Sequence, residues 1–104
     1  MQRSNLVQKA RTRKKLGVVA YLKQAFKDFS CPVYLFGSYA TEQFHGNSDV
    51  DILVISPKES IQINYRKACD KMSELGLGYD ILVTDSLEQL DRSIVDSLLK
   101  INVT

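Results

Sequence analysis

Several features that would assign this sequence to particular protein classes are missing. No apolar run approaches the ~20 residues that cross a bilayer, which excludes a membrane-spanning helix. The N-terminus lacks the apolar core of a secretory signal, and the two cysteines, Cys31 and Cys69, lack metal-ligand spacing. Repeats, low-complexity tracts and linkers rich in proline or glycine are also absent. We therefore expect a single cytoplasmic domain over residues 1–104, with both cysteines reduced.

Acidic residues are absent from the first 27 positions, which carry eight basic side chains. The rest of the chain carries six basic and twelve acidic residues, so the net charge of +2 hides an uneven distribution. We favour a solvated helix face as the explanation, although such a block could also attract RNA or an acidic partner. Up to Lys23, Tyr21 is the only aromatic side chain, which makes nucleic acid the least favoured partner.

Apolar residues recur at helical spacing in some segments and form short continuous runs in others. We expect the first helix to begin between Arg11 and Lys15 and to end before Pro32, because a residue that precedes proline resists helical geometry. Strands are predicted at 33–36, 49–55 and 79–84, and further helices at 38–44, 60–75 and 86–98. This α-β-α-β-α-β-α order is typical of an α/β (α+β) layer fold.

Each predicted helix has an apolar stripe or a capping residue that defines it. Ser38 is expected to cap the short second helix, and either Asp85 or Ser86 the last one. The inward stripe of the first helix would comprise Val18, Leu22, Ala25, Phe26 and Phe29. The third helix would bury Ile61, Tyr65, Ala68 or Cys69, and Met72. The last would bury Leu87, Leu90, Ile94, Val95 and Leu98.

The most informative stretch lies between the first two predicted strands. Gly37 and Ser38 follow the first apolar run, and Asp49 and Asp51 open the second. Positions i and i+2 of a strand face the same side, so these two carboxylates would lie together and repel each other unless a cation holds them. A glycine lets the backbone approach a phosphate, and a serine that opens a helix offers its hydroxyl and N–H groups. The stretch predicts a metal-dependent phosphate-transfer site.

Asp80, at the start of the third strand, would join this site if the second and third strands run parallel. The helix between them would then form a right-handed crossover. The first strand would have to run antiparallel to the second, because only then do Gly37 and Ser38 reach the same edge. Convergence of these residues predicts a three-stranded mixed sheet.

Three carboxylates at one edge suit Mg²⁺, which takes one or two carboxylates together with phosphate oxygens and waters. Asp49 and Asp51 would bridge two ions, one of which holds a nucleoside triphosphate and its pyrophosphate leaving group. The other would lower the pKa of an acceptor hydroxyl, with Asp80 completing its shell and helping to take the proton. His45, the only histidine, is expected in the connecting loop.

The pattern Gly37-Ser38, ten residues, Asp49-Val50-Asp51 and a later strand carboxylate resembles the minimal nucleotidyltransferase family of the DNA polymerase β-like superfamily. The resemblance implies that Asp49, Asp51 and Asp80 bind magnesium and that Gly37 and Ser38 hold the phosphates of the nucleotide. It also implies transfer of a nucleoside monophosphate, most often AMP from ATP, to a hydroxyl. Small members commonly pair with a helical HEPN ribonuclease toxin and act as its antitoxin, some by adenylylating a tyrosine.

The chain departs from this family pattern at two positions. Many members have an arginine directly after Gly-Ser and another two residues later, where this chain has Tyr39 and Thr41. The loss of two cations near the triphosphate leaves a second hypothesis open, in which a weak or inactive module neutralises its partner by binding alone. The short chain has almost nothing left for an acceptor-binding domain, so either a partner protein is the acceptor or a second copy completes the cleft.

Overall fold

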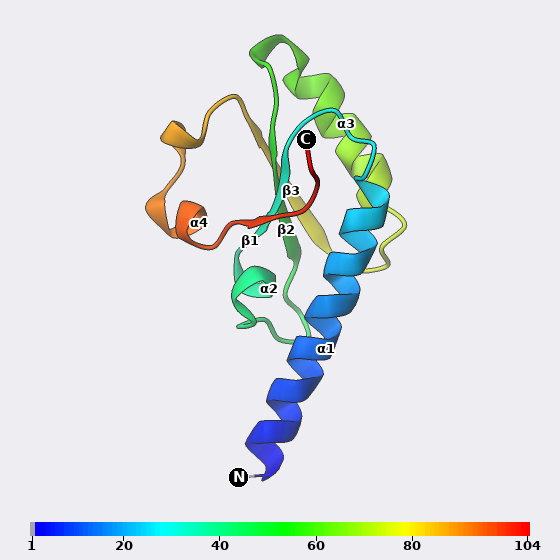
Figure 1. The fold of residues 1–104 in the computed structure, drawn as a ribbon, viewed down its shortest axis with the longest axis vertical. Coiled ribbons are helices and arrows are strands. Elements are labelled where there is room, and N and C mark those ends of the chain that lie inside the picture. The colour runs from blue at the N-terminus through cyan, green and yellow to red at the C-terminus, as the bar shows by residue number, and fades with distance from the viewer. Residues whose placement is uncertain (1) are drawn as a thin grey trace.

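The computed structural model describes residues 2–104 and the side chains of residues 6–104. Its helices and strands form one body in which a single sheet is flanked by helices (Figure 1). The elements are α1 (Gln2–Ala25), β1 (Val33–Phe36), α2 (Ser38–Thr41), β2 (Val50–Ile55), η1 (Lys58–Ser60), α3 (Ile61–Met72), β3 (Tyr79–Thr84), η2 (Leu87–Gln89), α4 (Arg92–Asp96) and β4 (Leu99–Lys100). The order of strands in the sheet is β3-β2-β1-β4.

The directions of the first three strands agree with the prediction. β1 runs antiparallel to β2, and β2 runs parallel to β3 with α3 as the connection between them. The C-terminal end of β1 and the N-terminal ends of β2 and β3 therefore lie at the same end of the sheet. We call this region the carboxylate edge, because Asp49, Asp51 and Asp80 lie there.

The sheet has a fourth strand, so the prediction of three strands was wrong. Residues 86–98 form two short helical turns instead of one helix, and no residue of either turn is buried. β4 then pairs antiparallel with β1. The physical reason is the open edge of β1, whose backbone groups need hydrogen-bond partners. The Asn102 side chain adds to this pairing, because it accepts the Val33 N–H at 3.0 Å and donates to the Cys31 carbonyl at 2.8 Å.

The main core lies between one face of the sheet and helices α1 and α3, and residues 85–98 lie on the other face (Figure 1). The stripe predicted for α1 packs into this core, with Leu22 and Phe26 fully buried. On α3 the prediction was wrong at Tyr65, which is exposed. Asn64 is buried instead, because its amide can donate a hydrogen bond to Ser56 Oγ at 2.7 Å.

Helix α1 begins far earlier than predicted, at Gln2 rather than between Arg11 and Lys15. The apolar stripe lies only on the half that packs on the sheet, so it could not mark the true start. The other half extends past the end of the sheet (Figure 1), and the molecule measures 51 Å along its longest axis against 29 and 24 Å along the others. No helix in the described part of the chain has both the length and the apolar composition that a membrane span requires.

Candidate functional site

The structure brings the three predicted carboxylates together at one edge. Asp51 and Asp80 lie opposite each other in adjacent parallel strands, and such partners are ~4.8 Å apart and point to the same face. Asp49 comes directly before β2, two residues from Asp51. Asp49 and Asp80 are exposed, whereas Asp51 is half-buried. This arrangement follows from the parallel pairing of β2 and β3 that the sequence predicted.

Asp51 is the side chain most strongly affected by this arrangement. Its pKa is raised from 3.8 to about 6, first by burial and then by the negative charges of Asp80 and Asp49. Burial and a neighbouring negative charge both disfavour the ionised carboxylate. A cation bound at this edge would offset both effects and keep Asp51 ionised.

A preformed metal cage is not part of this edge. Within residues 2–104, no three His, Cys, Asp or Glu side chains are arranged so that they alone could hold a metal ion. Mg²⁺ usually takes only one or two carboxylates and completes its shell with substrate phosphates and waters. The carboxylate oxygens at the carboxylate edge are suitable ligands for such an ion. The ion would also relieve the electrostatic repulsion at Asp51. The full three-carboxylate ligand set stays a prediction.

Gly37 lies directly against Asp51, because its neighbour Phe36 pairs with Asp51 in the β1–β2 register. Its φ of +75° is unfavourable for other residues, and an added Cβ would lie 2.5 Å from Asp51 Oδ2. The position therefore requires glycine for both backbone conformation and space. The Gly37 N–H donates to Ser97 Oγ at 3.1 Å, so the residue that follows α4 holds this turn. Ser97 was not predicted, because residues 86–98 were expected to form one helix.

Gly78 leaves room for the side chain of Asp49, as Gly37 does for that of Asp51. A Cβ at this position would collide with Asp49 Oδ1. Gly78 was not among the residues predicted for the site. Its position directly before the strand that carries Asp80 was the available indication of a role at the site.

Comparison with known proteins assigns the family of this fold and edge. A model of the nucleotidyltransferase domain family matches residues 17–101. The chain belongs to the nucleotidyltransferase domain family. The match includes all four strands and begins within α1 at Gly17.

One solved structure has a fold similar to that of this nucleotidyltransferase domain. That structure, described as a toxin–antitoxin with AMP-PNP, contains a chain with 21% sequence identity and a TM-score of 0.53. The similarity covers 80% of this chain and 71% of that one. No curated protein sequence is similar enough to this chain to be matched to it.

The two positions that lack arginine have other structural roles in this nucleotidyltransferase domain. Tyr39 is 1% exposed and stacks on Phe44 with 4.0 Å between the ring centroids. Lys14 Nζ lies 5.9 Å from the centroid of each ring. The Thr41 hydroxyl is within hydrogen-bonding distance of the Gly37 carbonyl, at 3.3 Å. Position 39 therefore belongs to the core, and position 41 stabilises the turn without supplying a charge.

Ser38 lies beside a cavity that could take part of a substrate. It is the first residue of α2, with Gly37 at the capping position, so the prediction that Ser38 caps the helix was wrong. The cavity of about 400 Å³ lies between the Gly37-Ser38 turn and α4, and Thr41, Ser93 and Ser97 bring hydroxyl groups to its lining. Small-molecule sites have volumes of ~300–1,000 Å³. His45 lies in the exposed loop that leads to Asp49, as predicted.

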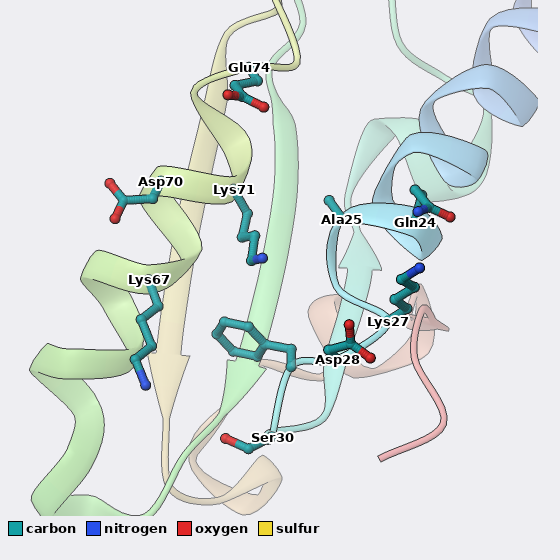
Figure 2. A pocket seen from close by; sticks show the side chains of 10 residues that line it. Gln24, Ala25, Lys27, Asp28, Ser30, Lys67, Asp70, Lys71 and Glu74 are labelled. Atoms are coloured by element: carbon teal, nitrogen blue, oxygen red, sulfur yellow. The ribbon is translucent and has the colours of Figure 1, made fainter.

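A larger cavity, of about 780 Å³, lies between the end of α1 and α3 (Figure 2). Neither the Gly37-Ser38 turn nor any of the three aspartates lines it. Its charged lining is balanced, with three lysines and three acids, namely Lys27, Lys67, Lys71, Asp28, Asp70 and Glu74. The smaller cavity includes the Gly37-Ser38 turn in its lining but none of the three aspartates. We place the candidate site at the carboxylate edge because burial and the charges of Asp80 and Asp49 raise the pKa of Asp51 there, and a bound cation would offset both effects.

Proposed function

We propose that this nucleotidyltransferase domain transfers a nucleoside monophosphate, AMP from ATP, to a hydroxyl group of a partner protein. The observation that carries the proposal is the environment of Asp51. This half-buried carboxylate faces Asp80 in register, feels the charge of Asp49 and leaves space only for glycine at position 37. Such an edge favours a ligand that combines cations with phosphate groups.

Each residue of the carboxylate edge would have its own role in the transfer. Asp49 and Asp51 would hold two Mg²⁺ ions, with Asp80 as the third carboxylate. When bound, the ions neutralise the triphosphate and lower the pKa of the attacking hydroxyl. Gly37 and Ser38 would position the phosphates. The acceptor oxygen forms a bond to the α-phosphorus, the bond to pyrophosphate breaks, and Asp80 accepts the proton of the hydroxyl.

The partner in this proposal is a helical HEPN-type ribonuclease toxin, and the chain acts as its antitoxin. The similar solved structure, described as a toxin–antitoxin with AMP-PNP, supports a nucleotide and a partner of this kind. The fold also supports an acceptor on another molecule, because the four strands and their helices already form the carboxylate edge. An acceptor hydroxyl would then come from the partner or from a second copy of the chain.

Transfer of labelled AMP tests this function directly. The chain would be co-expressed with the product of the neighbouring reading frame, purified, and incubated with ATP labelled at the α-phosphate in the presence of Mg²⁺. We expect label on the partner, and none with Asp49→Asn/Asp51→Asn. Asp70→Asn, which changes an exposed carboxylate away from the edge, should label as the wild type does. Absence of label with every nucleotide would contradict the proposal.

A second candidate is a module that neutralises its partner by binding without catalysis. The burial of Tyr39 and the backbone hydrogen bond of Thr41 favour it, because neither position supplies a cation for the triphosphate. Neutralisation of the toxin by the Asp49→Asn/Asp51→Asn variant would support this candidate. Loss of neutralisation with retention of the complex would support catalysis.

A further inference from the structure

The first half of α1 stands apart from the rest of the domain. We call residues 6–16 the arm. It extends past the end of the sheet at which the carboxylate edge lies (Figure 1), and the family match begins only at Gly17. One side of the arm faces the loop that leads to Asp49, where Val7, Lys14 and Phe44 line a shared cavity. A molecule bound to the arm would therefore lie at the same end of the molecule as the candidate site.

A continuous row of residues lies on the face of the arm that points away from the domain. Positions three or four apart share a helix face, and the row continues beyond the arm into the packed half of α1. We call this row the outer stripe; its members are Leu6, Lys9, Arg13, Leu16 and Ala20. All five are exposed, with Leu6 at 67% and Leu16 at 64%. The stripe thus combines apolar side chains with cations and has no partner within the described residues.

The charges of the arm are unfavourable for an isolated helix. Lys9 and Arg13 are four residues apart, and like charges at this spacing destabilise a helix. The first turn of α1 contains no acidic residue to interact with the helix dipole. Within residues 6–104, the ion pair that involves the arm is Lys15 with Glu42 at 3.7 Å, and Lys15 faces the domain, where it also donates to the Ala40 carbonyl at 2.7 Å.

We propose that the outer stripe docks an acidic amphipathic helix of a partner protein. Apolar residues of that helix would cover Leu6 and Leu16, and its Asp and Glu side chains would pair with Lys9 and Arg13. The like charges of the stripe oppose pairing with the same stripe of a second copy. The exposed leucines are unsuited to a phosphate backbone, which is contacted by charged and polar groups.

This inference rests on the proposed function in one respect, the existence of a protein partner whose acceptor hydroxyl must reach the carboxylate edge. Docking on the outer stripe would hold that partner at the same end of the molecule as the carboxylate edge, on the side of the arm opposite the loop that leads to Asp49. Binding to the stripe does not itself require the metal, the nucleotide or the three aspartates. The docking and the transfer can therefore fail independently.

A helical peptide of about 20 residues, with leucine and glutamate in a heptad pattern, serves as the probe. Its binding to the full chain would be followed by fluorescence anisotropy. We expect saturable binding that Lys9→Glu/Arg13→Glu weakens about tenfold or more, and Leu6→Ser/Leu16→Ser by a similar factor. The matched control, Lys67→Glu/Lys71→Glu, makes the same charge change on exposed α3 positions and should stay within about twofold of the wild type. Circular dichroism would confirm that each variant is folded.

Three results would overturn the inference. The first is absence of saturable peptide binding, or equal weakening by the α3 control. The second is binding of a single-stranded oligonucleotide, instead of the peptide, that Lys9→Glu/Arg13→Glu removes. The third is self-association, measured by sedimentation, that the same variant abolishes. Peptide binding by Asp49→Asn/Asp51→Asn at wild-type strength would support docking even if no AMP transfer is found.

Discussion

The carboxylate edge and the arm both gather charges of one sign, but with different physical consequences. At the edge, half-buried Asp51 lies near Asp49 and Asp80, and its pKa rises to about 6. On the arm, Lys9 and Arg13 are exposed, where water and salt weaken their repulsion. Burial, rather than the number of charges, therefore decides where a bound counter-ion is required. A cation at the edge would offset the burial and repulsion at Asp51, whereas the exposed cations of the arm do not require a bound anion.

The two regions also differ in how firmly the fold holds them. The edge is fixed by β1, β2 and β3 and by the hydrogen bond from Gly37 N–H to Ser97 Oγ at 3.1 Å. The arm is attached to the domain by a few polar contacts, such as Thr12 Oγ1 to Glu42 Oε1 at 2.6 Å. Substitutions should consequently change activity and stability at the edge, and partner binding at the arm.

The largest effect is expected for Asp51→Asn. The amide cannot hold a cation as the carboxylate does, so the rate of AMP transfer should fall ~100-fold or more, as when a group that acts on the transition state is removed. The free energy of unfolding should not decrease, because the repulsion with Asp80 is relieved. Steady-state rates and urea denaturation measure the two quantities. Full activity of this variant would remove Asp51 from the site.

Gly37→Ala should affect both activity and stability. The added methyl group meets Asp51 Oδ2, and φ at this position is +75°. We expect the free energy of unfolding to fall by ~1–3 kcal/mol, together with loss of transfer. The control is Gly46→Ala, because a Cβ at Gly46 meets no atom within 4 Å. Equal stability of the two variants would show that Gly37 does not constrain the edge.

The dependence of stability on pH should show the raised pKa of Asp51. The folded state binds this proton more tightly than the unfolded chain does, so the contribution of Asp51 is most favourable below pH 4. It is lost as the pH rises from 3.8 to about 6. Solvent screening limits the loss to about 1 kcal/mol. Urea titrations across this range should show a loss in the wild type that Asp51→Asn lacks; parallel pH profiles would contradict the burial of this charge.

The smallest effect on the domain itself is expected for Lys9→Glu/Arg13→Glu. Both side chains are exposed, and surface substitutions usually change the free energy of unfolding by less than ~0.5 kcal/mol. Affinity for Mg²⁺-ATP should also stay unchanged, because the stripe faces away from the edge. Thermal denaturation and nucleotide titration provide the measurements. A large loss in either would mean that the arm is part of the folded core or of the site.

The sequence predicted those structural elements that depend mainly on residues close to one another in the chain. The apolar runs at Val33–Phe36 and Tyr79–Thr84 marked two strands at their observed bounds. The need to bring Asp80 beside Asp51 predicted the strand directions, because few topologies allow it. The role of each side chain at the edge stays a prediction.

The features that the sequence did not predict depend on contacts between distant segments. β4 forms because β1 has an open edge, and Ser97 reaches Gly37 only after the chain has returned across the sheet. Tyr39 was interpreted as a missing cation, while its burial against Phe44 depends on how α2 packs. The start of α1 was predicted too late in the chain, because the arm has no buried stripe.

Calorimetric titration with ATP would show whether the carboxylate edge is a cation-dependent nucleotide site. We expect binding in the presence of Mg²⁺, with loss of binding in EDTA and in the Asp49→Asn/Asp51→Asn variant. Asp70→Asn should bind as the wild type does. Equal affinity for ATP with and without Mg²⁺, unchanged by the double substitution, would show that the carboxylate edge is not such a site.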